Sequence, residues 1–373
     1  MSLTDRKIDV AGGGVAGLAV ARALAQRGAK VRLVERAPEI TEVGAGIQIS
    51  PNGMRVMDAL GLGDALRAVS RPGKSVALRD GHTGRRIVRL DLEKAKGDFF
   101  FVHRARLIEV LAKGASDAGV EIVLGQELLP EASDADLILG ADGWRSQFRA
   151  AMNPHETPFF TGQVAWRAMI PDDGYPEANV FMGPGRHLVS YPLAGGLRNI
   201  VAVEEREVWA EEGWFNRDDP GTVRTAFAEF GGPVPGWLAH LDEVHLWGLF
   251  RYPVAPKWHD GAKIAILGDA AHPTLPFLAQ GANMALEDAW VLADCLEAMP
   301  QATALARCQE LRQARTTRIV DAASANARNY HLRGITRLVA HTVLRFGGTM
   351  APNAPLKRFS WLYDYDATQQ VAK

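Results

Sequence analysis

The first residues that could do chemistry are a glycine-rich turn and an acid downstream of it. Gly12, Gly14 and Gly17 form the pattern G-x-G-x-x-G directly after the apolar residues 8–11. Gly12 permits a tight turn, Gly14 leaves space for a pyrophosphate against the backbone, and Gly17 allows the next helix to pack closely. Glu35 follows at the distance at which an acid accepts hydrogen bonds from ribose hydroxyls. This combination predicts a dinucleotide site.

The surrounding sequence supplies the elements that this site needs. Residues 8–11 predict a strand, residues 18–27 a helix, and residues 30–34 a second strand that ends at Glu35. The helix N-terminus presents free N–H groups and a partial positive charge to phosphates. An ordinary glycine turn is the alternative. It would not require both strands, the helix and the acid in this order, so we favour the dinucleotide site.

Two further apolar runs end in glycine turns that carry an aspartate. Residues 135–140 and 264–267 read as buried parallel strands, followed by Asp142 and Asp269. The carboxyl ends of strands in open α/β sheets meet at one edge, where ligands bind. Each aspartate could therefore bind a cofactor hydroxyl, or it could equally cap a local turn or helix. The sequence leaves both interpretations open.

Composition limits the class of protein. The chain has 373 residues, 47% of them hydrophobic and 23% charged, as in an ordinary globular protein of one or two domains. A net charge of -1 gives no reason to expect a nucleic-acid or membrane partner. Residues 1–9 lack the apolar region of a signal peptide, and no apolar run is long enough to span a bilayer. We therefore expect a soluble, cytoplasmic protein.

The two cysteines do not indicate a metal site. Cys295 and Cys308 lie in a predicted helical region, without the spacing of metal ligands. We expect inert thiols in a reducing compartment, no disulfide framework and no metal.

The character of the sequence changes twice along the chain. Segments between residues 157 and 249 are short, aromatic-rich and punctuated by proline and glycine, which predicts an antiparallel sheet. Near Lys263 the earlier pattern returns, and long helices follow. We expect an α/β fold: a Rossmann-like cofactor domain with a parallel sheet, interrupted by an antiparallel-sheet substrate domain and followed by C-terminal helices. The expected limits are 1–75, 99–153 and 263–330 for the first domain, 76–98 and 154–262 for the second, and 331–373 for the helical segment.

Three separated segments resemble the single-component FAD-dependent aromatic hydroxylases, the class A flavoprotein monooxygenases. They are GGGVAGL with Glu35 and Arg36, DLILGADGWRS (136–146), and GDAAHPTLPFLAQGANMALEDA (268–289). The salicylate and 3-hydroxybenzoate hydroxylases are most similar, through EVGAGIQISPN (42–52), HRARL (103–107), GRHLVSYP (185–192) and WLYDYD (361–366). The sequence departs from the usual pattern at Ala16, where glycine is common, and at Trp144, where a small aliphatic residue is usual.

The resemblance implies FAD as the cofactor and assigns its contacts. Gly12, Gly14 and Gly17 would line the pyrophosphate, Glu35 the adenosine ribose, and Arg36 the adenine end. Arg104 and Asp269 would contact the pyrophosphate or the ribityl chain. The flavin ring would meet the start of a helix at Gly281, Ala282 and Asn283, whose N–H groups can stabilise negative charge. Gly46, among small residues, would let a flat ligand lie against the backbone, and Asp142 is a further candidate contact.

The resemblance also implies mono-oxygenation of a small aromatic substrate, phenolic or carboxylated. NAD(P)H would reduce FAD, O2 would add at flavin carbon 4a to give the hydroperoxide, and the distal oxygen would pass to the ring. The sequence has no second dinucleotide fingerprint, so the choice between NADH and NADPH stays open. A homodimer is one oligomeric state open to such a chain. The alternatives are another FAD-dependent oxidoreductase, an epoxidase of a different ring, and a non-catalytic flavin-binding protein.

A phenol titrates near pKa ~10, so a base in the pocket would help to form the reactive phenolate. His187 is our candidate, with Tyr191 on the same face of a predicted strand; a structural histidine is the alternative. Pro276 would either offer its carbonyl at the reactive edge of the flavin or only shape its loop. We expect the substrate pocket between the inserted sheet and the flavin, with His187 and Tyr191 facing Pro276. We interpret His272 as structural, and Arg167 as a surface arginine rather than a carboxylate partner.

Overall fold

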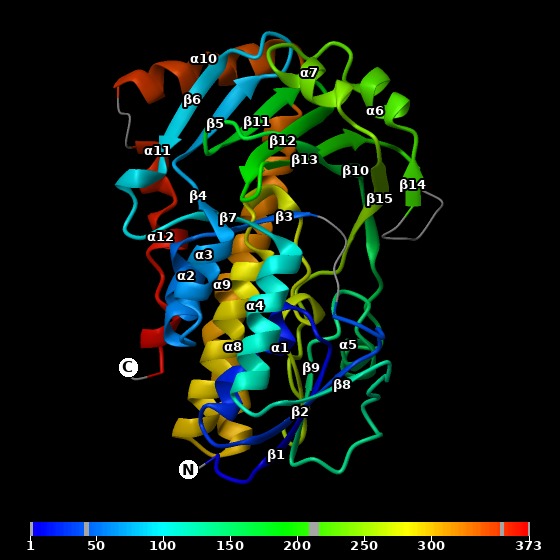
Figure 1. Cartoon of the computed structure of the whole chain (residues 1–373), viewed down its shortest axis with the longest axis vertical. Coiled ribbons are helices and arrows are strands. Elements are labelled where there is room, and N and C mark those ends of the chain that lie inside the picture. The colour runs from blue at the N-terminus through cyan, green and yellow to red at the C-terminus, as the bar shows by residue number, and fades with distance from the viewer. Residues whose placement is uncertain (1–2, 41–44, 209–215, 351–353, 372–373) are drawn as a thin grey trace.

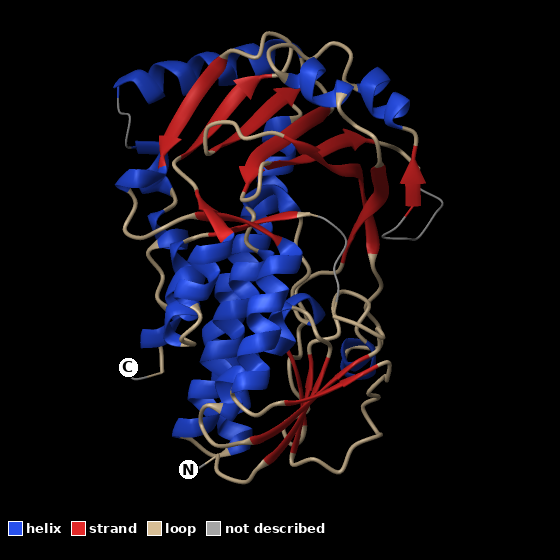
Figure 2. Cartoon of the chain, viewed as in Figure 1, coloured by secondary structure: helices blue, strands red, loops and turns tan. Residues whose placement is uncertain are grey.

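The computed structural model describes residues 3–40, 45–208, 216–350 and 354–371. Its parallel sheet and its large second sheet lie at opposite ends of the molecule, with a layer of helices beside the parallel sheet (Figure 1, Figure 2). The predicted α/β class, with a Rossmann-like sheet, a second sheet and C-terminal helices, is confirmed.

The first sheet has five strands, all parallel, in the order β16-β9-β1-β2-β8. Their bounds are Ile264–Ile266, Leu137–Gly140, Lys7–Ala11, Lys30–Glu35 and Glu121–Leu124. Helices α1 (Val15–Ala25), α4 (Arg104–Asp117) and α8 (Gly281–Ala298) pack together beside it. Strand β9 is buried along its whole length, as expected for a strand covered on both faces.

The second sheet has eight strands in the order β14-β15-β10-β13-β12-β11-β5-β6. Their bounds are Asn216–Asp218, Val244–Arg251, Phe159–Pro171, Leu197–Glu205, Arg186–Leu193, Glu177–Gly183, Ser75–Asp80 and Arg86–Asp91. The sheet is antiparallel as predicted, except that β11 pairs with β5 in parallel. Strand β5 comes from an earlier part of the chain, so no hairpin constrains its direction.

Two short helices on this sheet were not predicted. Helix α6 (Pro220–Ala226) starts with a proline and is capped by Asp219, whose Oδ1 accepts from the Gly221 N–H at 2.9 Å. Helix α7 (Val234–Ala239) follows. Together they bury the outer face of the sheet against Trp166 and Phe181. The sheet's other face is therefore the one left to form a site.

The remaining elements connect the two sheets. A small sheet has the order β3-β7-β4 (Gly46–Ile49, Phe100–His103, Ser70–Pro72). The shorter helices are α2 (Pro51–Ala59), α3 (Gly63–Val69) and α5 (Gln147–Met152), with the 3₁₀ turns η1 (Leu92–Lys94), η2 (Gly268–Ala270) and η3 (Pro276–Leu278). The predicted domain limits are compatible with these strand memberships and stay a prediction.

The C-terminal part is helical. Helix α9 (Gln301–Tyr330) packs along α8 at one end and reaches the second sheet at the other, where Ala327 joins a cluster with Val203 and Trp247. Helices α10 (Gly334–Met350), α11 (Ala354–Arg358) and α12 (Ser360–Tyr363), then η4 (Ala367–Gln369), complete the described chain. Helix α10 lies over β6, as Figure 1 shows. No helix in the described ranges has the length and apolar character needed to cross a bilayer.

The two cysteines are buried free thiols, one in α8 and one in α9. Burial raises the pKa of Cys295 to about 11 and also raises that of Cys308. Both thiols are therefore protonated at neutral pH and unreactive, as we expected.

A buried network of charges joins α8 to α9. Arg312 places Nε 2.7 Å from Asp288 Oδ1 and Nη2 2.7 Å from Glu287 Oε2, and all three side chains are fully buried. Arg315 adds a contact of 2.8 Å to Glu287. The His272 ring contacts Asp288, so His272 has the structural role that we expected. Burial alone would raise the pKa of Asp288, but His272 and Arg312 outweigh it and lower the pKa to about 2.

Replacing Arg312 with alanine should strongly destabilise the fold. The substitution removes from two buried carboxylates a cation that both of them contact, and breaking a buried ion pair typically costs about 3–5 kcal/mol of unfolding free energy. Arg307→Ala is a matched control on the same helix, because its pair with Glu310 is exposed and worth about 0–1 kcal/mol. Urea unfolding of the three proteins measures the difference. A loss no larger in Arg312→Ala than in the control would refute this account of the network.

Candidate active site

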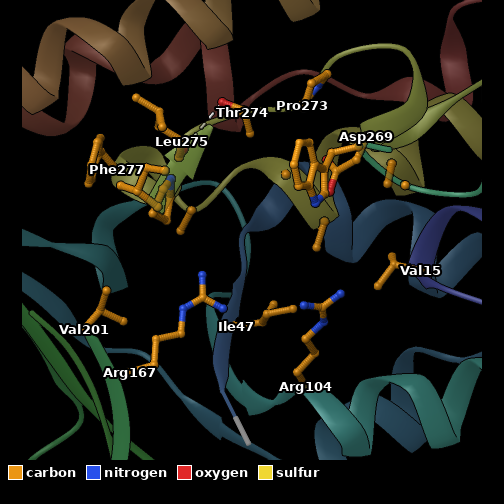
Figure 3. Close-up of a pocket in the computed structure, with 18 of the residues that line it drawn as sticks. Val15, Ile47, Arg104, Arg167, Val201, Asp269, Pro273, Thr274, Leu275 and Phe277 are labelled. Atoms are coloured by element: carbon orange, nitrogen blue, oxygen red, sulfur yellow. Dashed lines mark hydrogen bonds between the residues drawn. The ribbon is translucent and has the colours of Figure 1, made fainter. Parts of the chain in front are cut away.

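One cavity of about 320 Å³ lies between the parallel-sheet half and the eight-stranded sheet. Its size is that of a small-molecule site. The first half contributes the glycine turn, the start of α8 and the loop before it. The second half contributes β10, β12, β13 and β15. Figure 3 shows side chains from both halves converging on this space. The cavity thus lies where the sequence predicted a pocket.

The three fingerprint glycines have different tasks. Gly12 has φ +106°, and a Cβ there would overlap the carbonyl of Ala141. A Cβ at Gly17 would overlap the carbonyl oxygen of Gly12. By contrast, a Cβ at Gly14 would meet none of the described atoms within 4 Å, and Gly14 lines the cavity. Gly12 and Gly17 therefore shape the turn, whereas Gly14 keeps the cavity open at the start of α1.

The start of α1 has no side chain that would compete with a bound anion. The N-cap of α1 is Gly14, which has no side chain to cap the helix, and the first turn contains no acidic residue. Glu35, at the end of β2, accepts hydrogen bonds from the N–H groups of Gly13 (2.6 Å) and Ala37 (2.9 Å). It is thereby fixed beside the turn. Arg36 is exposed next to it. Glu35 and Arg36 are not among the cavity-lining residues, and their contacts to a cofactor stay predictions.

Arg104 and Asp269 belong to the parallel-sheet half of the molecule. Arg104 starts α4 and Asp269 belongs to η2; both line the cavity, and Figure 3 shows the Arg104 side chain extending towards Asp269. Asp269 lines this cavity, which lies between the two halves of the molecule. Desolvation raises the pKa of the carboxyl, while His272 and Arg104 oppose that shift. A hydroxyl group of a ligand could hydrogen-bond to the Asp269 carboxyl whether or not that carboxyl is protonated.

The start of α8 faces the cavity through Gly281 and Ala282. The side chain of Asn283 does not line it. Its Oδ1 accepts from the Ser50 N–H at 3.0 Å, and its Nδ2 donates to the carbonyls of Gln48 (3.0 Å) and Ala279 (2.9 Å). Asn283 therefore fixes β3 against α8, and only its backbone could meet a flavin.

Asp142 also lies outside the set of lining residues. Its Oδ2 accepts from the Gln147 N–H at 2.8 Å, at the first residue of α5. Asp142 thus caps the start of α5, and helix capping was one of the two interpretations that the sequence left open. A contact between Asp142 and a cofactor hydroxyl stays a prediction.

Gly46 brings the small sheet against the large one. Its N–H donates to Asn199 Oδ1 at 2.8 Å, and a Cβ there would lie only 2.7 Å from the Tyr191 ring. Gly46 lines the cavity, as predicted for a residue beside a flat ligand. Residues 42–44 of the same predicted segment lie outside the described residues.

Strand register explains which side chains form the sheet wall. Val189 of β12 pairs with Val201 of β13, and Val201 pairs with Arg167 of β10. His187 and Tyr191 flank Val189 at a spacing of two and so share its face. All five residues line the cavity. His187 and Tyr191 thus lie on one wall, as predicted.

His187 has one ring nitrogen engaged and one without a partner among the described residues. Nδ1 lies 2.7 Å from His331 Nε2. Nε2 is buried and has no hydrogen-bond partner within the described part of the chain. Burial, and then the neighbouring His331, lower the pKa of His187 well below its ordinary value, so the ring is neutral at pH 7. A neutral ring can accept a proton from a bound ligand.

The opposite wall is the loop before α8. Pro276 begins η3 and lines the cavity with Leu275 and Phe277. The Phe277 ring meets His187 edge-on, with 5.0 Å between centroids. Tyr191 packs against Phe101 at 5.1 Å, and burial raises the pKa of its hydroxyl although Arg167 opposes that shift. Tyr191 therefore keeps its proton and could act as a hydrogen-bond donor.

Arg167 corrects our prediction that it is a surface residue. It is only half-exposed, lines the cavity, and stacks on the Trp247 ring with the guanidinium carbon 4.1 Å from the ring centroid. Figure 3 shows the guanidinium directed into the space below the loop of Leu275 and Phe277. The sequence pattern does not specify how β10 pairs with β13. This pairing places Arg167 directly beside Val201 on the face that lines the cavity.

Two aromatic lining residues were given no role in the sequence analysis. Trp247 and Phe277 are aromatic residues in apolar segments, which more often form core. Trp247 becomes part of the wall because β15 pairs with β10, opposite Ala165. Only the assembled sheet reveals this.

Comparisons with known proteins agree with this geometry. The family model described as FAD binding domain matches residues 5–323. A 3-amino-4-hydroxybenzoate 2-monooxygenase of Streptomyces cremeus is 36% identical over 358 residues, or 88% of each chain. A 3-hydroxybenzoate 6-hydroxylase of Polaromonas naphthalenivorans is 32% identical over 404 residues, covering 99% of this chain and 98% of its own. A solved salicylate hydroxylase substrate complex has the same fold, with a TM-score of 0.82 and 22% identity over 99% of this chain and 98% of its own.

The fold and the site define a flavoprotein, and the chain belongs to the FAD-binding domain family. The relatives that it matches almost end to end are named as monooxygenases and hydroxylases of hydroxybenzoates, so the resemblance inferred from separated segments is confirmed. The described residues fit FAD. Gly14 leaves the backbone open to a pyrophosphate, and the N-termini of α1 and α8 both face the cavity with free N–H groups.

Proposed function

We propose that the chain is an NAD(P)H-dependent FAD monooxygenase that hydroxylates a small aromatic carrying both a hydroxyl and a carboxylate. One observation carries the proposal: the start of α8, the Arg167 guanidinium and His187, whose Nε2 has no hydrogen-bond partner among the described residues, all lie at the same cavity. Bound FAD supplies the activation of oxygen and its transfer to the ring. The two buried free thiols fit a reducing compartment, and we propose the cytoplasm.

His187 is proposed to take the phenolic proton. The phenol becomes a better nucleophile as the phenolate, and a neutral imidazole within hydrogen-bond reach can accept that proton. Tyr191, which stays protonated, would orient the ring by donating a hydrogen bond. Pro276 would hold the ring from the other side, and Phe277, which packs on His187, would help to exclude water.

Arg167 is proposed to bind the carboxylate. Among the lining residues contributed by the eight-stranded sheet, it is the one with a permanent positive charge. Stacking on Trp247 restrains the guanidinium, so less entropy is lost when it binds a carboxylate through two parallel hydrogen bonds. Both named relatives act on benzoates, which supports a carboxylated substrate.

Replacing Arg167 with glutamine should raise KM for hydroxybenzoates by about 10–100-fold, since a charge-assisted hydrogen bond contributes about 1.5–3 kcal/mol. FAD content and turnover of an uncarboxylated phenol should change little. Arg217→Gln is the control, because Arg217 is an exposed residue at the edge of the same sheet. Steady-state kinetics with a matched phenol and hydroxybenzoate pair measure the effect. An equal loss on both substrates would exclude a carboxylate contact.

The function itself is tested by oxygen uptake. FAD-loaded protein is supplied with NADH or NADPH and a panel of hydroxybenzoates and aminohydroxybenzoates, and hydroxylated product is quantified. Product formed in proportion to oxygen consumed supports the monooxygenase. Reduction of the flavin by NAD(P)H without product from any aromatic would favour a different oxidoreductase. Absence of flavin reduction would favour a non-catalytic flavin protein.

A further inference from the structure

His187 is the inner end of a chain of side chains that reaches the protein surface. Its Nδ1 lies 2.7 Å from Nε2 of His331, the residue that follows α9. His331 Nδ1 lies 2.9 Å from Oε1 of Glu205, the last residue of β13. His187 is fully buried and the His331 side chain is 2% exposed, whereas the Glu205 side chain is 39% exposed. The chain therefore connects the cavity to solvent through three titratable groups.

The Glu205 carboxylate sets the direction of the hydrogen bonds from His187 to His331 and from His331 to Glu205. Burial alone would raise the pKa of Glu205, but hydrogen bonds from Arg333 and His331 outweigh it and lower the pKa, so Glu205 is ionised and only accepts. His331 Nδ1 must then carry the hydrogen, and its Nε2 accepts from His187 Nδ1–H. The amide nitrogen of Gln163, a donor, also lies 3.3 Å from His331 Nδ1, but the closer Glu205 carboxylate can only accept, so Nδ1 keeps its hydrogen and donates it to Glu205. The consequence is a lone pair on Nε2 of His187, a residue that lines the cavity.

We propose that His331 and Glu205 form a proton relay for His187, which carries the substrate's phenolic proton to the surface. This relay rests on the proposed function of the site. As the phenol O–H bond breaks, Nε2 of His187 gains that proton and Nδ1 of His187 passes its own to Nε2 of His331. Nδ1 of His331 then passes its proton to Glu205, which releases it to water. The reverse sequence returns a proton to the product and restores both rings.

The surroundings of the relay suit this transfer. The rings of Phe277 and Tyr330 lie 5.0 and 5.2 Å from the His187 ring and shield it, so water has little access to it except from the cavity. His331 follows the C-terminus of α9, where the helix dipole favours a transient imidazolium. Arg333 donates to Glu205 at 2.5 Å. The positive charges of Arg333 and Arg186 repel a positive charge on His331, so both oppose a lasting imidazolium at that residue. His331 therefore passes protons on rather than storing them.

The first test measures the tautomers and needs no turnover. Two-dimensional ¹⁵N–¹H NMR of the labelled FAD-bound protein reports which nitrogen of each ring carries hydrogen. The relay requires Nδ1–H on both His187 and His331 near neutral pH, the less common form of a free imidazole. Replacing Glu205 with glutamine should weaken the preference at His331. Nε2–H on either ring in the wild-type protein would overturn the proposal.

The second test measures proton transfer. Glu205→Gln and His331→Gln keep hydrogen-bonding groups in place but interrupt the relay. With 3-hydroxybenzoate or 3-amino-4-hydroxybenzoate as the probe, each variant should lose at least about tenfold in hydroxylation rate with FAD content unchanged. The loss in Glu205→Gln should shrink as the concentration of a small buffer such as imidazole rises, which a purely structural defect would not do.

Glu243→Gln is the matched control, because Glu243 pairs with Arg217 in an exposed ion pair. A wild-type rate in both relay variants, or a loss that buffer does not change, would overturn the relay while leaving the proposed function intact. Failure of the proposed function appears separately, as absence of product from the wild-type enzyme, and in that case the NMR tautomers still decide whether the relay exists.

Discussion

Gly14→Val protein should fold normally and be colourless. A side chain at this position meets none of the described atoms within 4 Å, so the fold tolerates it, but it would fill the space that the pyrophosphate of FAD needs. The φ of Gly14 is -81°, which valine can adopt, so backbone strain adds no defect. Absorbance of the purified protein and titration with added FAD measure the effect.

Gly17→Val is the contrasting variant. A Cβ at Gly17 overlaps the carbonyl oxygen of Gly12, so this protein should fail at the level of folding rather than of binding. Circular dichroism and thermal unfolding separate the two variants. Gly14→Val protein that binds FAD as the wild type does would show that the pyrophosphate does not lie at this turn.

His187→Ala should retain FAD and lose most of its hydroxylation rate, on the order of 10²–10⁴-fold, the usual contribution of general-base catalysis. The phenol would stay protonated and react poorly, so oxidation of NAD(P)H would release hydrogen peroxide instead of product. Stopped-flow spectra of flavin oxidation, combined with product quantification, measure both rate and coupling.

His240→Ala is the control, since His240 is exposed at the end of α7. Unchanged rate and coupling in His187→Ala would reduce His187 to a structural residue of the sheet. The base would then have to be another group in the cavity, and the relay through His331 would lose its starting point.

The glycine turn after β1 could be predicted because its signals are local. Gly12, Gly14 and Gly17 lie within six residues, and Glu35 ends the adjoining strand, so one short segment encodes the whole turn. Backbone requirements such as the positive φ of Gly12 select glycine directly. His187 and Tyr191 could also be placed on one face, because the period of a strand is fixed.

The remaining features depend on contacts between distant segments. Arg167 enters the cavity because of the register between β10 and β13, which a strand pattern alone does not specify. His331 lies 144 residues from His187, and Glu205 lies 126 residues from His331, with no motif linking them. Asn283 has a side chain suited to a cofactor, yet the backbone of Gln48 and Ser50, far away in the sequence, engages it.

The central claim, oxygen transfer from O2 to a bound aromatic, is tested most directly with isotopic oxygen. FAD-loaded protein, NAD(P)H and a hydroxybenzoate are incubated under ¹⁸O2, and the product is analysed by mass spectrometry. The account predicts one ¹⁸O atom in each molecule of a hydroxylated product. Consumption of ¹⁸O2 and NAD(P)H with no labelled aromatic product from any member of the hydroxybenzoate and aminohydroxybenzoate panel would contradict it.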